Sequence, residues 1–378
     1  MLLIACLASM AVLPKLISGF DGPVTDLPYD FRSYIYGCQF LMGIALLYSA
    51  GLVISNWRGQ STQLPGLFVT VAAGWIVLAG WVYLRSLLNA WTGISVTRIE
   101  LIILAALPLA LWIRRYGFPA LVQETKRMLP ELFIFFLLAV AVAQHELPRD
   151  IMLSSDPDQH LFFATQIAKL GGVPWHQADW GALPFGYPAG SGVMIVVLSA
   201  LSLTGAGDAT MAIPILQAYL AVLILAGTLL APIKGPLERI FCLVGVMLVF
   251  HYLLPYGFEA NHYHLEGYGR LASLWVMALL LLPCITNRWP WKGVNTPFRA
   301  WIWSSGIVAF AITLNPINAF LGAILAGFGF TKHFPKSVWL IPALPLICVM
   351  LVALDPYYFE FMTGTARQGG VVLINQPT

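Results

Sequence analysis

Residues 34–54 read YIYGCQFLMGIALLYSAGLVI, a stretch of 21 residues that contains no charged side chain. As an α-helix this stretch is about 32 Å long, because each residue adds about 1.5 Å. That length matches the hydrocarbon core of a bilayer, which is about 30 Å thick. A helix also satisfies its own backbone hydrogen bonds, which lipid cannot do. The stretch therefore predicts a membrane-spanning helix.

The same apolar character extends along the whole chain. Its 378 residues are 59% hydrophobic and 10% charged, whereas soluble domains carry about 25% charged residues. Ten further apolar stretches predict spanning helices, at about residues 2–20, 66–84, 100–113, 131–145, 210–231, 239–254, 271–286, 301–316, 319–331 and 337–354. The predicted fold class is therefore an all-α polytopic membrane helix bundle with eleven spanning helices.

Composition also excludes some classes of protein. The formal net charge of +3 is small, and no long basic run with interleaved aromatic residues occurs, so we expect no nucleic-acid partner. The five cysteines lie in or beside apolar stretches without a CxxC pair, which is typical of small buried side chains.

Basic residues in short loops set the predicted orientation. Arg114, Arg115, Lys126 and Arg127 form the strongest cluster and are expected in the cytoplasm. The next helix, 131–145, carries the chain outward, so residues 146–209 form a long outer loop that contains interfacial helices. Short loops and the lack of Asn-x-Ser/Thr sites favour the bacterial inner membrane, with the long outer loop facing the periplasm.

Residues 190–203 are apolar but only fourteen in number, and they decide the later topology. If they cross the membrane, seven basic residues fall outside: Lys234, Arg239, Arg288, Lys292, Arg299, Lys332 and Lys336. We therefore predict an interfacial or re-entrant segment tucked against the bundle. The alternative is a true span, with another short stretch wrongly assigned.

This topology divides the chain in two. Residues 1–130 are predicted to be N-terminal membrane helices, and residues 131–378 a catalytic membrane core. The second polar loop, 255–270, then falls on the same side of the membrane as the loop 146–209.

The long loop contains an acidic motif. Asp156 and Asp158 flank Pro157, and proline favours extended geometry in the residue before it. Alternate residues of an extended chain point in opposite directions, so the two carboxylates are expected to have different roles. Residues 161–170 then predict a short amphipathic helix in the plane of the interface, capped by Asp158 and ended by two glycines at 171 and 172.

These elements resemble the first outer loop of GT-C glycosyltransferases. The resemblance covers residues 131–290 and rests on the acidic residues, His160, the interfacial helix, the Gly172–Pro174 turn and the Tyr-Pro-x-Gly motif at Tyr187–Gly190. Members of that superfamily transfer sugars from polyprenyl-phosphate donors at the outer face of the membrane. The resemblance thus implies a GT-C-like bundle, a lipid-linked sugar donor, and a glycan, lipid or protein acceptor.

The resemblance also implies roles for residues of the loop. Asp156 or Asp158 matches the acidic residue of the superfamily, which acts as a base toward the acceptor or as a ligand of a divalent metal ion. We favour Asp156 as the base, with Asp158 assisting or capping. His160 contacts the phosphate or makes a structural hydrogen bond.

The second loop supplies further candidates. Glu266 is a candidate for the acidic residue that faces the first loop, and Arg270 for a phosphate contact, with snorkelling to the interface as the alternative. His262 and His264 are candidate metal ligands together with Asp156, the alternative being a solvated polar loop.

Aromatic side chains complete the predicted site. Trp180 and Tyr187 are candidates for stacking on sugar rings, although the aromatic belt of any membrane protein has a similar composition.

Other functions remain as alternatives to a glycosyltransferase. They are a transporter or flippase of lipid-linked glycans, an O-antigen-type polymerase or ligase, and a noncatalytic assembly subunit. The scarcity of ionisable side chains inside the predicted spans disfavours an ion-coupled transporter.

Overall fold

The fold is known from a computed structural model that describes residues 29–55, 65–145, 155–173, 189–253, 268–291 and 294–353. Within these ranges the chain consists of helices and the turns that join them, and no strand occurs in them. The predicted helix 2–20 lies outside the described residues.

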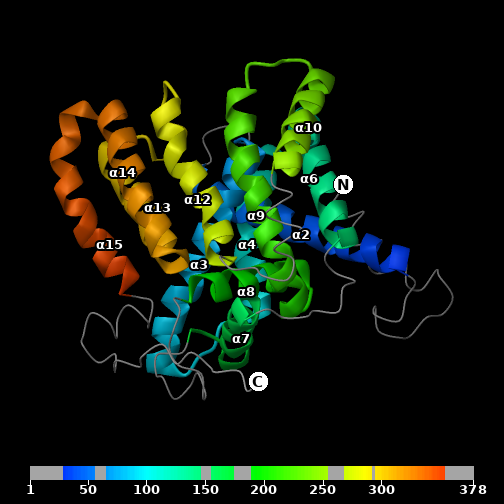
Figure 1. The fold of residues 1–378 in the computed structure, drawn as a ribbon, viewed down its shortest axis with the longest axis horizontal. Helices are drawn as coiled ribbons and strands as arrows, with labels where there is room; N and C mark the ends of the chain where they lie inside the picture. Colours follow the sequence, from blue (N-terminus) through cyan, green and yellow to red (C-terminus); the bar gives the residue numbers. More distant parts are fainter. Residues whose placement is uncertain are drawn as a thin grey trace.

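Figure 1 shows a bundle of helices that mostly run up and down. The elements are α2 Tyr29–Ser55, α3 Leu67–Thr92, α4 Arg98–Tyr116, α5 Phe118–Arg127, α6 Leu129–His145, α7 Ser155–Leu170, α8 Gly190–Ser202, α9 Ala206–Leu229, α10 Pro236–Leu253, α12 Tyr268–Ile285, α13 Pro297–Leu314, α14 Pro316–His333, the 3₁₀ helix η4 Pro335–Ala343, and α15 Leu344–Val352. Each apolar stretch predicted within the described ranges falls on a helix, the last of them on η4 and α15 together.

Several of the helices are long and apolar enough to cross a membrane. Four meet both conditions: Gly37–Ile54, Leu67–Asn89, Pro297–Leu314 and Pro335–Val352. A fifth is counted if α4 and α5, which are bent by 114° relative to each other, form one broken span. These helices agree with the prediction of a helical membrane protein.

Helix α5 was not predicted, because its basic residues were assigned to a loop. The chain turns sharply after α4 at Gly117, which has a φ of 83°, and α5 then starts with a proline in its first turn. Arg127 forms a 2.7 Å ion pair with Glu124, one turn earlier. The basic cluster that was predicted to be cytoplasmic therefore lies at the ends of two helices, α4 and α5, that meet in a sharp bend.

Helices α2 and α3 approach each other unusually closely at two glycines. A Cβ atom added to Gly51 would come within 1.8 Å of the Thr70 carbonyl oxygen, and one on Gly74 within 1.8 Å of the Leu47 carbonyl oxygen. Small residues allow such backbone contact between membrane helices. The α2–α3 pair is thus held by contacts that only glycine permits.

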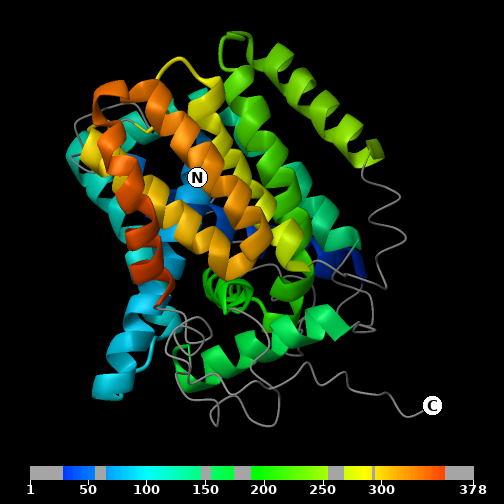
Figure 2. The same ribbon diagram turned by 60° about the vertical axis from the view of Figure 1, so that its left-hand side comes forward.

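The helix ends that carry the described basic residues of the predicted inner loops lie at one end of the bundle, the upper end in Figures 1 and 2. Helices α4, α9, α12 and α14 end there, and α6, α10 and α13 begin there. At this end Arg239 forms a 2.6 Å ion pair with the buried Glu131, which joins the first turns of α10 and α6. This ion pair therefore links α6 and α10 at the end of the bundle where the described basic residues lie.

Helix α8 lies across the bundle rather than along it. It is nearly horizontal in Figure 1 and is seen end-on in Figure 2. It has 13 residues, a length of about 20 Å, and all but one of them are buried. The segment is therefore a short helix buried in the bundle, which agrees with the predicted packing of residues 190–203 against the other helices.

The N-terminal helices share a core with the rest of the chain. Helices α2, α3 and α4 all pack on α8, and buried residues from α2 to α15 form one hydrophobic cluster. The helices before and after residue 130 therefore pack together without a separate core for each part.

Candidate functional site

Helix α7, which carries the acidic motif, lies across the lower end of the bundle in Figure 2. It packs on α8 and α9 through a buried face made of His160, Phe163, Ala164 and Ile167. These positions are spaced as one side of a helix requires. The helix predicted for this loop is therefore present, with His160 at 3% exposure on its inner side.

The start of α7 corrects one prediction. The helix begins at Ser155, so Asp156, Pro157 and Asp158 lie within its first turns and Asp156 is not extended. Asp158 is consequently not the residue that precedes the helix. Proline is tolerated here because the first N–H groups of a helix have no partner inside it.

The end of α7 agrees with the prediction that glycines stop the helix. Gly171 has a φ of 68°, and the Gly172 N–H donates to the Ile167 carbonyl at 3.0 Å. The Gly171 carbonyl accepts from the Val96 N–H at 2.6 Å, and Ser86 Oγ accepts from the Val173 N–H at 2.7 Å. The C-terminal end of α7 is therefore fastened to the turn between α3 and α4.

That turn is itself stabilised by a charged group. Glu100 Oε1 accepts from Arg85 Nε and from Trp81 Nε1, both at 2.9 Å. Thr97 caps α4, since its side chain accepts from the Glu100 N–H at 3.1 Å. The turn that supports α7 is thus stabilised by four side chains, those of Trp81 and Arg85 on α3 and those of Thr97 and Glu100 at the start of α4.

The first turn of α8 is inserted between α7 and α13. A Cβ atom on Gly192 would lie 3.1 Å from Phe163 Cβ, and one on Gly190 would lie 2.5 Å from the Thr313 carbonyl oxygen. Gly190 is the last residue of the predicted Tyr-Pro-x-Gly motif. The glycine of that motif therefore allows α8 to start against α13.

The starts of α12 and α14 are joined at this same end. Asn318 Nδ2 donates to Ser273 Oγ at 2.6 Å, and Asn315 Oδ1 accepts from the Asn318 N–H at 3.1 Å. Helix α12 begins at Tyr268, so Arg270 is its third residue. The first turns of α7 and α12, each with predicted site residues, therefore lie at the same end of the bundle (Figure 1).

The remaining predicted site residues lie outside the described residues: Trp180, Tyr187, His262, His264 and Glu266. Asp156, Asp158 and Arg270 are located by their positions on helices α7 and α12. In the described ranges no three His, Cys, Asp or Glu side chains come together as metal ligands. The predicted metal site thus remains a prediction.

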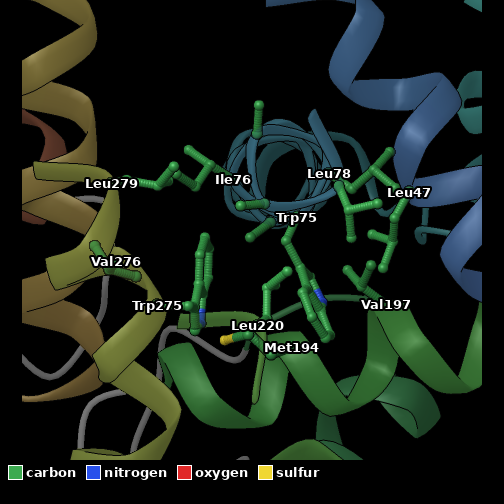
Figure 3. Packing of buried hydrophobic residues seen from close by; sticks show 14 of the residues in the cluster. Leu47, Trp75, Ile76, Leu78, Met194, Val197, Leu220, Trp275, Val276 and Leu279 are labelled. Atoms are coloured by element: carbon green, nitrogen blue, oxygen red, sulfur yellow. The ribbon is translucent and has the colours of Figure 1, made fainter. Parts of the chain in front are cut away.

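The structure also shows buried polar groups that the sequence interpretation missed. Ser191, Gln217 and Ser273 are at most 1% exposed. Gln217 Nε2 donates to Met194 Sδ at 3.4 Å, in a layer where Trp75 and Trp275 stack at 5.9 Å (Figure 3). The available signal was a lone polar residue inside an apolar stretch, which in a membrane protein marks a candidate for function.

Comparisons of the chain with family models, with curated proteins and with solved structures give no significant match.

Proposed function

We propose that the protein is an inverting membrane glycosyltransferase of the GT-C type. It would transfer a sugar from a polyprenyl-phosphate donor to a glycan, lipid or protein acceptor. The observation that carries this proposal is the position of α7, whose first turns hold Asp156, Asp158 and His160 at the end of the bundle where α12 starts with Arg270.

The chemistry needs few protein groups. The sugar is already attached to phosphate, a good leaving group. Asp156 would take the proton of the acceptor as its oxygen or nitrogen attacks the anomeric carbon. The bond between that carbon and the phosphate oxygen breaks, its electron pair leaves with the polyprenyl phosphate, and the configuration inverts.

Other predicted residues fit around this reaction. Arg270 would contact the phosphate, Glu266 would face the acidic motif, and Trp180 and Tyr187 would stack on the sugar. A divalent cation held by Asp156 with His262 and His264 would balance phosphate charge.

The membrane arrangement belongs to the same proposal. Helices α6, α9, α10, α12 and α14 have 17 to 24 residues, which is about 26 to 36 Å of helix. With the five candidates above and residues 2–20 they would give eleven spans. The basic ends of α4 and α5 would face the cytoplasm, and α7 would face the periplasm of a bacterial inner membrane.

The direct test is transfer of a labelled sugar from polyprenyl phosphate by membranes that contain the protein. Asp156→Asn should reduce the rate at least about a hundredfold, as loss of a general base does. Asp158→Asn should have a smaller effect. Glu238→Gln is the control, because Glu238 is an exposed carboxylate in the first turn of α10 at the opposite end.

Two outcomes would reject the assignment. Transfer that survives both aspartate substitutions would remove the catalytic role of the motif. Movement of the intact lipid-linked sugar across the membrane, without cleavage of the sugar–phosphate bond, would favour a transporter.

A further inference from the structure

The two ends of the buried helix α8 differ in how their backbone groups are hydrogen-bonded. At the C-terminal end, Ser199 Oγ donates to the Thr204 carbonyl at 2.7 Å. Gln39 Nε2 donates to the Leu203 carbonyl at 3.4 Å and Arg98 Nη2 to the Thr204 carbonyl at 3.5 Å. Donors from three helices therefore satisfy the carbonyl groups that follow α8.

The N-terminal end has no such partners among the described residues. No side chain caps α8, and its first turn contains no acidic residue. Gly190, Ser191 and Gly192 are all buried. Ser191 is 1% exposed, and its Oγ has no hydrogen-bond partner. The first N–H groups of a helix point out of its end, so this buried turn gathers several donors without acceptors.

The nearest described acceptor does not resolve this excess of donors. The Thr313 carbonyl packs on Gly190, but no hydrogen bond joins these two residues. Thr313 Oγ1 donates to the Phe310 carbonyl of its own helix. Buried donors are nearly always satisfied in proteins, so the turn requires an acceptor from elsewhere.

We propose that the first turn of α8 is a binding site for a phosphate group. The N–H groups of residues 190–192 and the Ser191 hydroxyl would donate to its oxygen atoms. The partial positive charge of a helix N-terminus favours an anion.

The site fits the donor of the proposed reaction and to that extent rests on the proposed function. Gly192 contacts Phe163 of α7, and His160 lies one turn earlier on the same buried face. Position 156 is one further turn away, about 10 Å along the helix axis from Phe163. A phosphate at α8 and a base near the start of α7 would thus bracket a sugar from two sides.

The test is binding of phosphate ligands to the purified full-length chain in nanodiscs. The probes are inorganic phosphate and a short-chain polyprenyl phosphate, followed by ³¹P NMR and calorimetric titration. Ser191→Ala should weaken phosphate binding about ten- to a hundredfold, since a hydrogen bond to a charged group is lost. Ser191→Asp should abolish binding, because its own carboxylate would occupy the turn.

Ser199→Ala is the matched control, since Ser199 is a buried serine on the same helix whose hydroxyl is bonded at the other end. It should bind phosphate as the unchanged protein does. A thermal unfolding curve for each variant establishes that it is folded.

Binding of both probes with equal dependence on Ser191 supports the site and shows that the phosphate group alone is recognised. Much tighter binding of the polyprenyl phosphate identifies the lipid as its source. The proposal is overturned if Ser191→Ala binds either probe as tightly as the unchanged protein, or if Ser199→Ala loses as much. If phosphate binding depends on Ser191 but no sugar transfer is found, only the proposed function fails. If transfer is found but phosphate binding ignores Ser191, only this site fails.

Discussion

The contact between α2 and α3 allows a prediction whose size follows from the structure. A Cβ on Gly51 would lie 1.8 Å from the Thr70 carbonyl oxygen, whereas ordinary contact begins at 3.4 Å. Gly51→Ala therefore requires the two backbones to separate locally by about 1.6 Å. Backbone atoms cannot rotate away as a side chain does, so the packing along both helices must open.

The expected loss of stability is about 1 to 3 kcal/mol, the usual cost of overpacking a core. Alanine is a better helix former than glycine by up to about 1 kcal/mol, which offsets part of this cost. Gly74→Ala should behave like Gly51→Ala, because its Cβ would meet the Leu47 carbonyl at the same 1.8 Å. Together the two substitutions should cost less than the sum of their single effects, since one separation relieves both.

Thermal unfolding of the purified protein in detergent measures the effect. At about 2 °C per kcal/mol, each variant should unfold about 2 to 6 °C lower. Gly80→Ala is the control on α3, the helix that also carries Gly74, because nothing lies within 4 Å of its added Cβ. It should be neutral or slightly stabilising. If the Gly51→Ala variant is as stable as the Gly80→Ala variant, then α2 and α3 do not approach each other as closely as described.

Two further predictions concern the lower end of the bundle and its orientation. Ser86→Ala should reduce the free energy of unfolding by about 1 to 3 kcal/mol and lower the unfolding temperature, because the buried Val173 N–H loses its acceptor. An unchanged melting curve would mean that this hydrogen bond does not hold the end of α7 against α3. Lys169 and Lys336 are both exposed and lie at opposite ends of the bundle. In a cysteine-free background, a single cysteine at either position should react with a membrane-impermeant reagent, each from a different side of the membrane. Labelling of both cysteines from one side would refute the topology.

Much of the fold was predictable because its signal is local. An uncharged stretch long enough to cross a bilayer has one stable conformation in lipid, and this fixed the positions of helices such as α2, α9 and α12. The basic residues predicted which loops lie on the same side of the membrane. A short helix at residues 190–203 was predictable from its fourteen apolar residues, and the prediction that it does not span rested on the seven basic residues that a span would place outside.

Other features were not predictable because they depend on distant partners. The local sequence does not distinguish the glycines of the α2–α3 contact from other glycines, since Gly80 of α3 has open space around it. Helix α5 was hidden by its charge, although Gly117 and the following Phe118 and Pro119 are typical of a break and a new helix start. The early start of α7 was missed because the preference of proline for an extended predecessor was given more weight than its tolerance in a first turn.

The residues of the candidate site were also only partly predictable, because some of them matter only through distant contacts. The sequence singled out Asp156, Asp158 and His160 because acidic and imidazole groups stand out in an apolar chain. It did not single out Ser191, because a serine between two glycines looks like an ordinary turn. Its importance arises only when α8 is buried, since a helix end in water would satisfy its N–H groups with solvent.

The burial of α8 is therefore the strongest physical argument for chemistry at this end of the bundle. Each buried donor without an acceptor costs about 1 to 3 kcal/mol, and a whole domain is stable by only about 5 to 15 kcal/mol. A first turn with several such donors would consume a large share of that margin if it served packing alone. Capping would have removed the cost with one substitution, since an aspartate or asparagine in place of Ala189 would satisfy the turn from the same chain. The chain has alanine there, and a first turn without a side-chain cap leaves its N–H groups available to an anionic ligand.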